Sequence, residues 1–289
     1  DAAGKSSHVG AQKDGAALTM SLTCLLAPNA SAHEHEMTPA QTSALAQADV
    51  MAVSGVDLEH FLDDAVVSSG FKGRMVVTSG VLTAADIDNP GTPDPEGAYT
   101  IDRGSERVDV APWPFPPEEA GEEPEFRFDP HVWTSPKRAR VQVENLGAGL
   151  AAAAPDAASS INAATASYLE DLDALDAWAT ASIETVPEGQ RVLFTSHDAF
   201  GYFSGDYGIR FIGAALSDFN DQQDATADHI ASAVQAVKDS GAVALFAENS
   251  NNSKSIEAIA RGAGVTPIVG DDALYGDSLG PDGSEGATY

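Results

Sequence analysis

Two histidines and two glutamates occupy four consecutive positions in the stretch SAHEHEMTP, residues 31–39. The chain has only seven histidines, so His33 and His35 form a local concentration. Imidazole nitrogens and carboxylate oxygens are common ligands of zinc and other divalent metals in proteins. A solvated surface turn can have the same composition, so this stretch alone leaves a metal site and a polar turn both open.

Two further histidines stand at predicted strand or helix ends. His131 lies in FDPHVWTSP, directly before a Ser-Pro helix start, and His197 lies in LFTSHDAFGYF, just past an apolar strand. The sequence separations between His33, His131 and His197 are far too long for a local zinc motif. If these residues meet, they meet across a cleft between two halves of the chain. Taken singly, each could instead cap or flank the helix that follows it.

The composition favours a cation as partner. The chain has 289 residues, enough for one large domain or two lobes, and 15 Lys+Arg against 44 Asp+Glu give a formal net charge of −29. This charge argues against a nucleic-acid partner or an anionic membrane surface, although surface acidity also serves solubility. No apolar run is long enough to span a bilayer, and we expect any export signal to have been removed or never present.

The single cysteine, Cys24, excludes an internal disulfide and a zinc site built from several cysteines. It lies in an alternating run that is typical of a strand. We therefore predict that Cys24 is a buried strand residue.

Strand and helix patterns alternate in both halves of the chain. Strands are predicted at 17–29, 50–55, 74–80, 191–195, 209–214, 242–248 and 265–270. Helices are predicted at 38–48, 58–66, 136–155 and 156–187, from residue 199, and at 222–239 and 253–262. Two α/β halves therefore flank two long helices. His33 falls beyond the carboxyl end of a strand, where open α/β sheets bind ligands.

Residues 84–128 break this alternation. They hold eight of the chain's 16 prolines and twelve acidic residues but no histidine. We predict a long loop with a short hairpin around residues 98–110.

Four ordered blocks of the sequence resemble the metal-specific solute-binding proteins of ABC importers, the zinc and manganese group. The blocks are PNASAHEHEMTPAQTSALAQADVMAVSGVDLE, DPHVWTSPKRARVQVENLGAGLAAAAPD, TSHDAFGYFSGDYGIRFIG and DDALYGDSLG. The family pattern is a histidine followed five residues later by Thr-Pro, which implies His33 as a metal ligand and leaves His35 at a non-ligand position. The resemblance likewise implies His131, His197 and Asp277 as the other three ligands.

The resemblance also implies a fold of two α/β lobes with mostly parallel sheets, joined by a long rigid backbone helix, with the metal site in the cleft between the lobes. The corresponding boundaries are an N-terminal lobe at 1–135, which includes the loop at 84–128, a linker helix at 136–155 and a C-terminal lobe at 156–289. The family opens with an apolar strand that residues 1–15 do not match, so no strand is predicted there.

The implied donor set points to a particular metal. Three imidazoles and one carboxylate form a four-coordinate shell that suits Zn²⁺, whereas manganese members tend to carry a carboxylate at the position of His197. We therefore expect Zn²⁺ rather than Mn²⁺. Glu248, at the end of a predicted strand, is a reserve candidate for the place of Asp277. Asp198 and Glu36 are candidates for orienting the imidazoles.

The function implied by the resemblance is extracytoplasmic capture of Zn²⁺, in the periplasm or at the cell surface, and its delivery to an ABC transporter membrane permease. Such a protein is not an enzyme. We expect a monomer with no nucleic-acid partner, and a periplasmic metallochaperone is a further candidate partner. The alternatives are a manganese-binding member of the family, a zinc-dependent hydrolase, and a cell-adhesion or metal-sensing protein on the same fold. Against the hydrolase, the sequence has no HExxH motif, and Asp277 would fill the position that catalytic zinc leaves to water.

Overall fold

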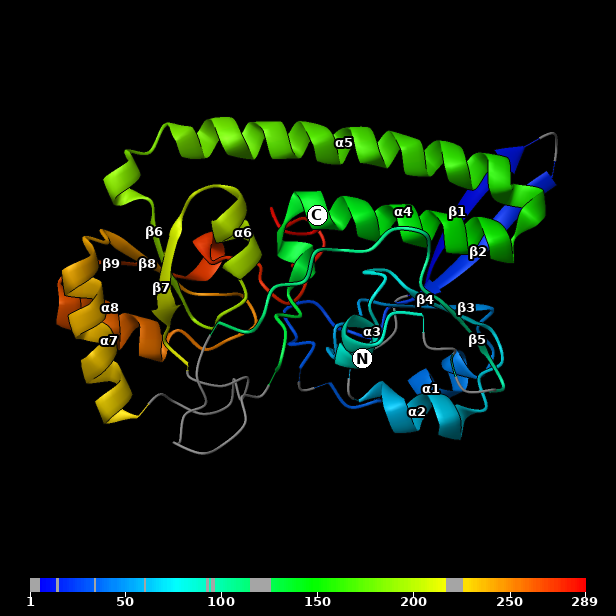
Figure 1. Cartoon of the computed structure of the whole chain (residues 1–289), viewed down its shortest axis with the longest axis horizontal. Coiled ribbons are helices and arrows are strands. Elements are labelled where there is room, and N and C mark those ends of the chain that lie inside the picture. Colours follow the sequence, from blue (N-terminus) through cyan, green and yellow to red (C-terminus); the bar gives the residue numbers. More distant parts are fainter. Residues whose placement is uncertain are drawn as a thin grey trace. The chain divides into compact units, whose positions relative to one another are not determined.

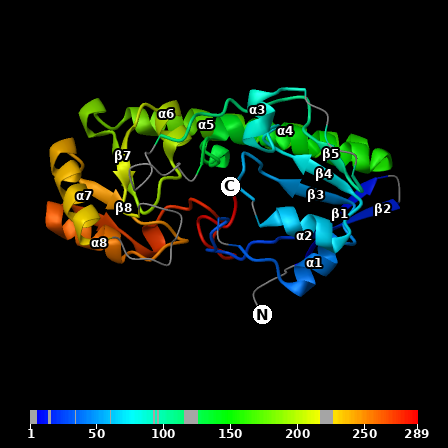
Figure 2. The same cartoon turned by 60° about the horizontal axis from the view of Figure 1, so that its bottom comes forward.

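The computed structural model describes residues 6–13, 16–33, 35–59, 61–91, 94, 97–114, 126–216 and 226–289. The chain divides into two compact units, whose elements are labelled in Figures 1 and 2. Unit 1 comprises 1–27, 35–113 and 126–176, and unit 2 comprises 28–34, 114–125 and 177–289. Each unit combines helices with parallel strand pairs, which confirms the predicted α/β class with mostly parallel sheets.

Unit 1 is built on a three-stranded parallel sheet in the order β3-β4-β5. Its elements are β1 (Ser6–Lys13), β2 (Ala16–Thr23), α1 (Pro39–Leu45), β3 (Val50–Val53), α2 (Leu62–Ser69), β4 (Arg74–Val77), α3 (Ala84–Asp88), β5 (Thr100–Asp102), α4 (Pro136–Ala153) and the first part of α5 (Ala158–Glu184). Buried apolar side chains of the sheet pack against α1 and α2 in one cluster that includes Phe71 and Val77. The strands and helices predicted here at residues 38–80 are thereby confirmed.

The region predicted as a long loop contains a strand of the sheet. The sequence predicts a hairpin at 98–110, but β5 pairs in parallel with β4. Arg74 and Asp102, on these two strands, form a salt bridge of 2.7 Å. The hairpin prediction is wrong because a strand pattern says nothing about the distance along the chain to its partner strand.

The first strand pair is an antiparallel hairpin of β1 and β2, which differs from the prediction. The strand predicted at 17–29 corresponds to β2, but its partner is β1 rather than the parallel sheet. Cys24 lies just after β2 and is exposed, so the prediction of a buried strand cysteine is also wrong.

Helix α4 packs unusually closely against its neighbours in unit 1. It begins at Ser135-Pro136 as predicted, with Ser135 as the capping residue and Pro136 in the first turn. A β-carbon on Gly149 would lie only 2.5 Å from Val76 of β4, and one on Gly147 would lie 2.3 Å from a side-chain oxygen of α5. These two glycines therefore allow α4 to lie against β4 on one side and α5 on the other, as Figure 1 shows for the two helices.

The two units divide the long helices at other positions than the predicted lobes do. α4 lies wholly in unit 1, whereas α5 begins in unit 1 and ends in unit 2. The predicted lobe boundaries at residues 135 and 155 stay a prediction. His33 belongs to unit 2, although the segments before and after residues 28–34 belong to unit 1.

Unit 2 confirms the predicted alternation of strands and helices. Its elements are the last part of α5, β6 (Val192–Thr195), α6 (Gly201–Asp206), β7 (Arg210–Ala214), α7 (Ala227–Ser240), β8 (Ala244–Phe246), α8 (Lys254–Ala263) and β9 (Thr266–Ile268). β6 pairs in parallel with β7, and β8 with β9, around a core that includes Phe194 and Leu245. The carboxyl ends of β6 and β8 lead into His197 and Glu248. The predicted start of α7 at 222–225 lies outside the described residues.

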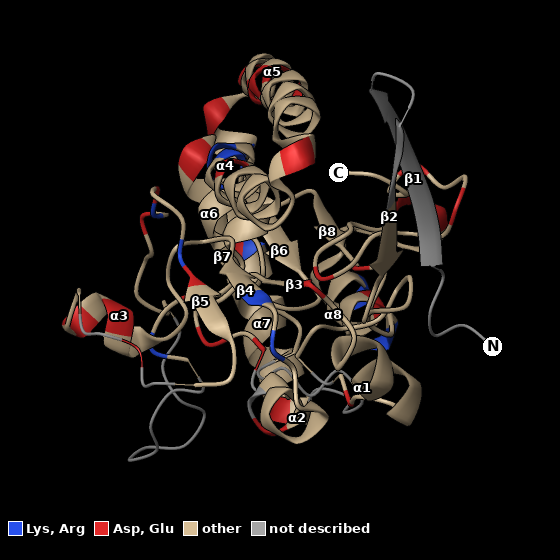
Figure 3. Cartoon of the chain, turned by 90° about the vertical axis from the view of Figure 1, so that its right-hand side faces the viewer, with Lys and Arg blue, Asp and Glu red and all other residues tan. Residues whose placement is uncertain are grey.

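The described elements carry many acidic residues and few basic ones. Figure 3 shows acidic positions on α3, α4 and α5, in keeping with the net charge of −29. Among the helices of the described ranges, none is both long and apolar enough to cross a lipid bilayer.

Candidate metal centre

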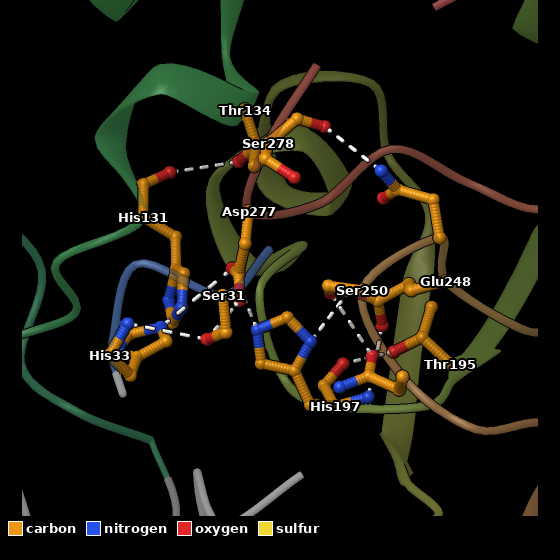
Figure 4. Close-up of polar contacts among 12 residues, drawn as sticks. Ser31, His33, His131, Thr134, Thr195, His197, Glu248, Ser250, Asp277 and Ser278 are labelled. Carbon is orange, nitrogen blue, oxygen red and sulfur yellow. Dashed lines mark hydrogen bonds and ion pairs between the residues drawn. The ribbon is translucent and has the colours of Figure 1, made fainter. Parts of the chain in front are cut away.

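Three of the four predicted metal ligands lie together in unit 2. His33 comes from the loop after β2, His197 from the loop after β6, and Asp277 from the segment after β9. One donor atom of each lies within 4.8 Å of a donor atom of the other two. The Oδ1 atom of Asp277 is 3.1 Å from His197 Nε2 and 3.7 Å from His33 Nε2. Figure 4 shows these side chains pointing toward one another, so unit 2 alone offers two imidazole nitrogens and one carboxylate.

Ser31 links the Asp277 side chain to the backbone of His33, and the sequence patterns did not identify it. Its hydroxyl accepts the backbone N–H of His33 at 3.2 Å and donates to Asp277 Oδ2 at 2.9 Å. One carboxylate oxygen of Asp277 is therefore held by Ser31, while the other faces the imidazoles. Serine two residues before a histidine is too common a pattern to predict this role.

Glu248 holds the His197 ring from the side opposite Asp277. Its Oε2 atom is 2.6 Å from His197 Nδ1, and its Oε1 atom accepts the backbone N–H of His197 at 2.9 Å. Because a carboxylate can only accept a hydrogen bond from Nδ1–H, this contact directs Nε2 toward Asp277. Glu248, predicted as a reserve ligand, thus contacts the ring nitrogen that faces away from the three-residue cluster. Of the two side chains predicted to orient imidazoles, Asp198 is buried and Glu36 is exposed.

The fourth predicted ligand, His131, belongs to unit 1. It is fully buried and lies directly before a 3-10 turn (Val132–Thr134) that leads into α4. Its Nδ1 atom is 2.8 Å from Asp129 Oδ1, which also accepts the His131 backbone N–H at 3.0 Å. Trp133 packs edge-on against the ring, with 5.3 Å between centroids. The sequence patterns did not identify Asp129, which lies two residues before His131 in FDPHVW. Asx turns of this kind nevertheless have a recognisable spacing.

His35, two residues after His33, has a different environment. It belongs to unit 1, where its ring packs edge-on against Phe61 with 4.9 Å between centroids. Burial lowers the pKa of His35, which favours its neutral form. The cluster in unit 2 contains His33 and not His35.

The charges of the unit 2 cluster depend on one another. Burial by itself lowers the pKa of His197, but the carboxylates of Asp277 and Glu248 raise it well above its usual range. Burial by itself raises the pKa of Asp277, but His197 and His33 hold it well below its usual range. Without a metal, the cluster therefore favours a protonated imidazole beside an ionised carboxylate. A divalent cation can replace that proton as the positive charge, because imidazole must be neutral to coordinate.

Sequence comparisons relate the chain to metal-uptake proteins. The model of the family described as zinc-uptake complex component A, periplasmic (ZnuA), matches residues 16–289. The manganese-binding lipoprotein MntA of Bacillus subtilis is 29% identical over 271 residues, which cover 93% of this chain and 77% of that protein. The zinc-binding protein AdcA of Streptococcus pyogenes serotype M6 is 35% identical over 142 residues, which cover 49% of this chain and 27% of AdcA.

Solved structures of similar fold come from the same group of proteins. The periplasmic zinc-binding protein TroA of Treponema pallidum superposes with a TM-score of 0.69 at 22% identity, covering 91% of this chain and 83% of TroA. A manganese-bound mutant of a periplasmic metal-binding protein from Candidatus Liberibacter asiaticus gives a TM-score of 0.68 at 18% identity, covering 92% and 84% of the two chains. At these identities the similarity establishes the two-lobe α/β fold.

Proposed function

Since this chain belongs to the periplasmic zinc-uptake component A family and is therefore a metal-binding component of ABC importers rather than an enzyme, we propose that its cargo is Zn²⁺. Family membership places it outside the cytoplasm, as the names of its relatives indicate. In this function the protein captures Zn²⁺ and passes it to a membrane permease. A metallochaperone partner and a monomeric state stay predictions.

The observation that carries the proposal is the buried cluster of His33, His197 and Asp277 in unit 2. We propose that His131 of unit 1 supplies the fourth donor. The support is a shared arrangement: in both His197 and His131 a carboxylate contacts Nδ1, which leaves Nε2 as the metal-binding atom. Histidines that bind metals commonly have such a carboxylate partner, which fixes the tautomer and the ring orientation.

The donor set favours zinc over manganese. Three imidazole nitrogens and one carboxylate suit the tetrahedral coordination of Zn²⁺, whereas Mn²⁺ prefers more oxygen donors. The relatives include both kinds, since MntA is named for manganese and AdcA for zinc. The alternative is therefore a manganese-binding member of the same family. A zinc-dependent hydrolase is the other function that three histidines could support. It is inconsistent with membership of this metal-uptake family.

We predict one tight Zn²⁺ site per chain, because the four proposed ligands supply a single coordination shell. The test is a titration of metal-free protein with Zn²⁺ in the presence of a competing chelator. His229→Ala serves as the control, because His229 on α7 already contacts the backbone oxygen of Ala214 at 3.1 Å through Nε2. This variant should match the wild type in stoichiometry and affinity. Two tight sites, or none, would contradict the proposal.

A further inference from the structure

We propose that Gly276 is a positioning residue of the metal site, because its missing side chain leaves the space in which Glu248 reaches His197. A β-carbon on Gly276 would lie 2.2 Å from Glu248 Oε2 and 3.4 Å from His197 Cε1. The Oε2 atom is the one that contacts His197 Nδ1 at 2.6 Å. Glycine therefore permits the carboxylate–imidazole contact that any larger residue at this position would disturb. The inference rests on the proposed function, since it concerns the proposed ligand His197.

The backbone around this contact is held on both sides. Leu274 pairs with Glu248 in a short parallel bridge: its N–H donates to the Ala247 carbonyl at 2.9 Å, and its carbonyl accepts the Asn249 N–H at 2.8 Å. The Glu248 N–H also donates to Ser196 Oγ at 3.2 Å. These bonds hold Leu274 against the segment that carries Glu248.

We expect a side chain at position 276 to displace the end of the Glu248 side chain, because its Oε2 atom would be the nearest neighbour of the new β-carbon. Glu248 is only 2% exposed, so its carboxylate has no direct route to solvent. Once Oε2 leaves Nδ1, the His197 ring loses the contact that directs Nε2 toward Asp277. The expected result is a metal site whose ligand is present but poorly oriented.

Gly276 also directly precedes Asp277, so a substitution there could act through the backbone of that ligand instead. A double-mutant cycle separates the two routes. Glu248→Ala removes the side chain that the new methyl group would meet. If Gly276 acts through Glu248, the effect of Gly276→Ala should nearly vanish in the Glu248→Ala background. If it acts through Asp277, the effect should persist there.

The experiment measures Zn²⁺ affinity by chelator competition and the visible absorption bands of bound Co²⁺ for the wild type, the two single variants and the double variant. Substituting residues that orient metal ligands typically costs about 10–100-fold in affinity. We expect Gly276→Ala and Glu248→Ala each to lose Zn²⁺ affinity by this factor and to alter the Co²⁺ bands. The double variant should lose at most about twofold more affinity than the weaker-binding of the two single variants. Gly205→Ala on α6, where a β-carbon meets nothing within 4 Å, should behave as wild type.

Circular dichroism of the metal-free variants checks that each is folded. If Glu248→Ala does not fold, Glu248→Asp takes its place in the cycle, since its shorter side chain also makes room for the methyl group. Wild-type affinity in Gly276→Ala, or a double variant whose loss is the product of the two single losses, would overturn the inference while leaving the proposed function intact. Failure of the wild type and of Gly205→Ala to bind Zn²⁺ would instead refute the proposed function.

Discussion

His33→Ala should abolish tight Zn²⁺ binding, whereas His35→Ala should leave most of it. His33 Nε2 lies 3.7 Å from Asp277 Oδ1 in the buried cluster, while the His35 ring packs against Phe61. Removing one of four donors should weaken binding by more than about 100-fold, because even residues that only orient ligands cost about 10–100-fold. His35→Ala should change affinity by less than about threefold, which is below 1 kcal/mol.

The two substitutions form a matched pair, since both remove one imidazole from the same short loop. Zn²⁺ affinities from chelator competition, with thermal unfolding of the metal-free proteins, give the comparison. If the two metal-free variants unfold at the same temperature but differ greatly in Zn²⁺ affinity, the weaker binding comes from a missing ligand and not from a damaged fold. If His35→Ala were the variant that loses binding, the histidine motif would be displaced by two residues and His33 would not be a ligand.

His197→Glu should lower the Zn²⁺ affinity and narrow the preference for Zn²⁺ over Mn²⁺. The substitution exchanges a nitrogen donor for a hard carboxylate that can coordinate through two oxygens, which suits Mn²⁺ better than Zn²⁺. The new carboxylate would also lie beside Asp277 and Glu248, which contact the present ring at 3.1 and 2.6 Å. Three buried acids in contact repel one another, so a divalent cation becomes necessary to stabilise them.

His197→Gln provides the control for this prediction, because it removes the imidazole without adding a charge. We expect it to lose affinity for both metals. Competition titrations of the three proteins with Zn²⁺ and Mn²⁺ give the ratio of affinities directly. An unchanged ratio and unchanged affinities in both variants would remove His197 from the coordination shell, whereas the same altered ratio in both would show that the new carboxylate does not coordinate the metal.

Sequence patterns predicted the parts of this protein that depend on local signals. Thr38-Pro39 marks the start of α1, where Thr38 and Gln41 form a capping box, and the apolar runs at 191–195 and 242–248 contain β6 and β8. Each of these signals is contained in a few consecutive residues. The choice of His33 over His35 as a metal ligand, which the resemblance to the family implied, stays a prediction.

The features that sequence patterns missed depend on which segments meet in space. β5 has an ordinary strand pattern, and only the fold determines that its partner is β4. Cys24 has apolar neighbours in the sequence, yet it is exposed after the β1–β2 hairpin. The contact of Glu248 with His197 joins residues from two different strand ends, and the space for it comes from Gly276, in a third segment. Such three-way arrangements leave no local pattern in the chain.

A direct competition between the two metals tests whether this protein takes Zn²⁺ as its cargo. Metal-free wild-type protein would be equilibrated with equal concentrations of Zn²⁺ and Mn²⁺, separated from free metal and analysed for bound metal by mass spectrometry. We expect one Zn²⁺ per chain and almost no Mn²⁺, because the proposed coordination shell has three imidazole nitrogens and one carboxylate. Bound Mn²⁺ in place of Zn²⁺, or no bound metal, would contradict this expectation.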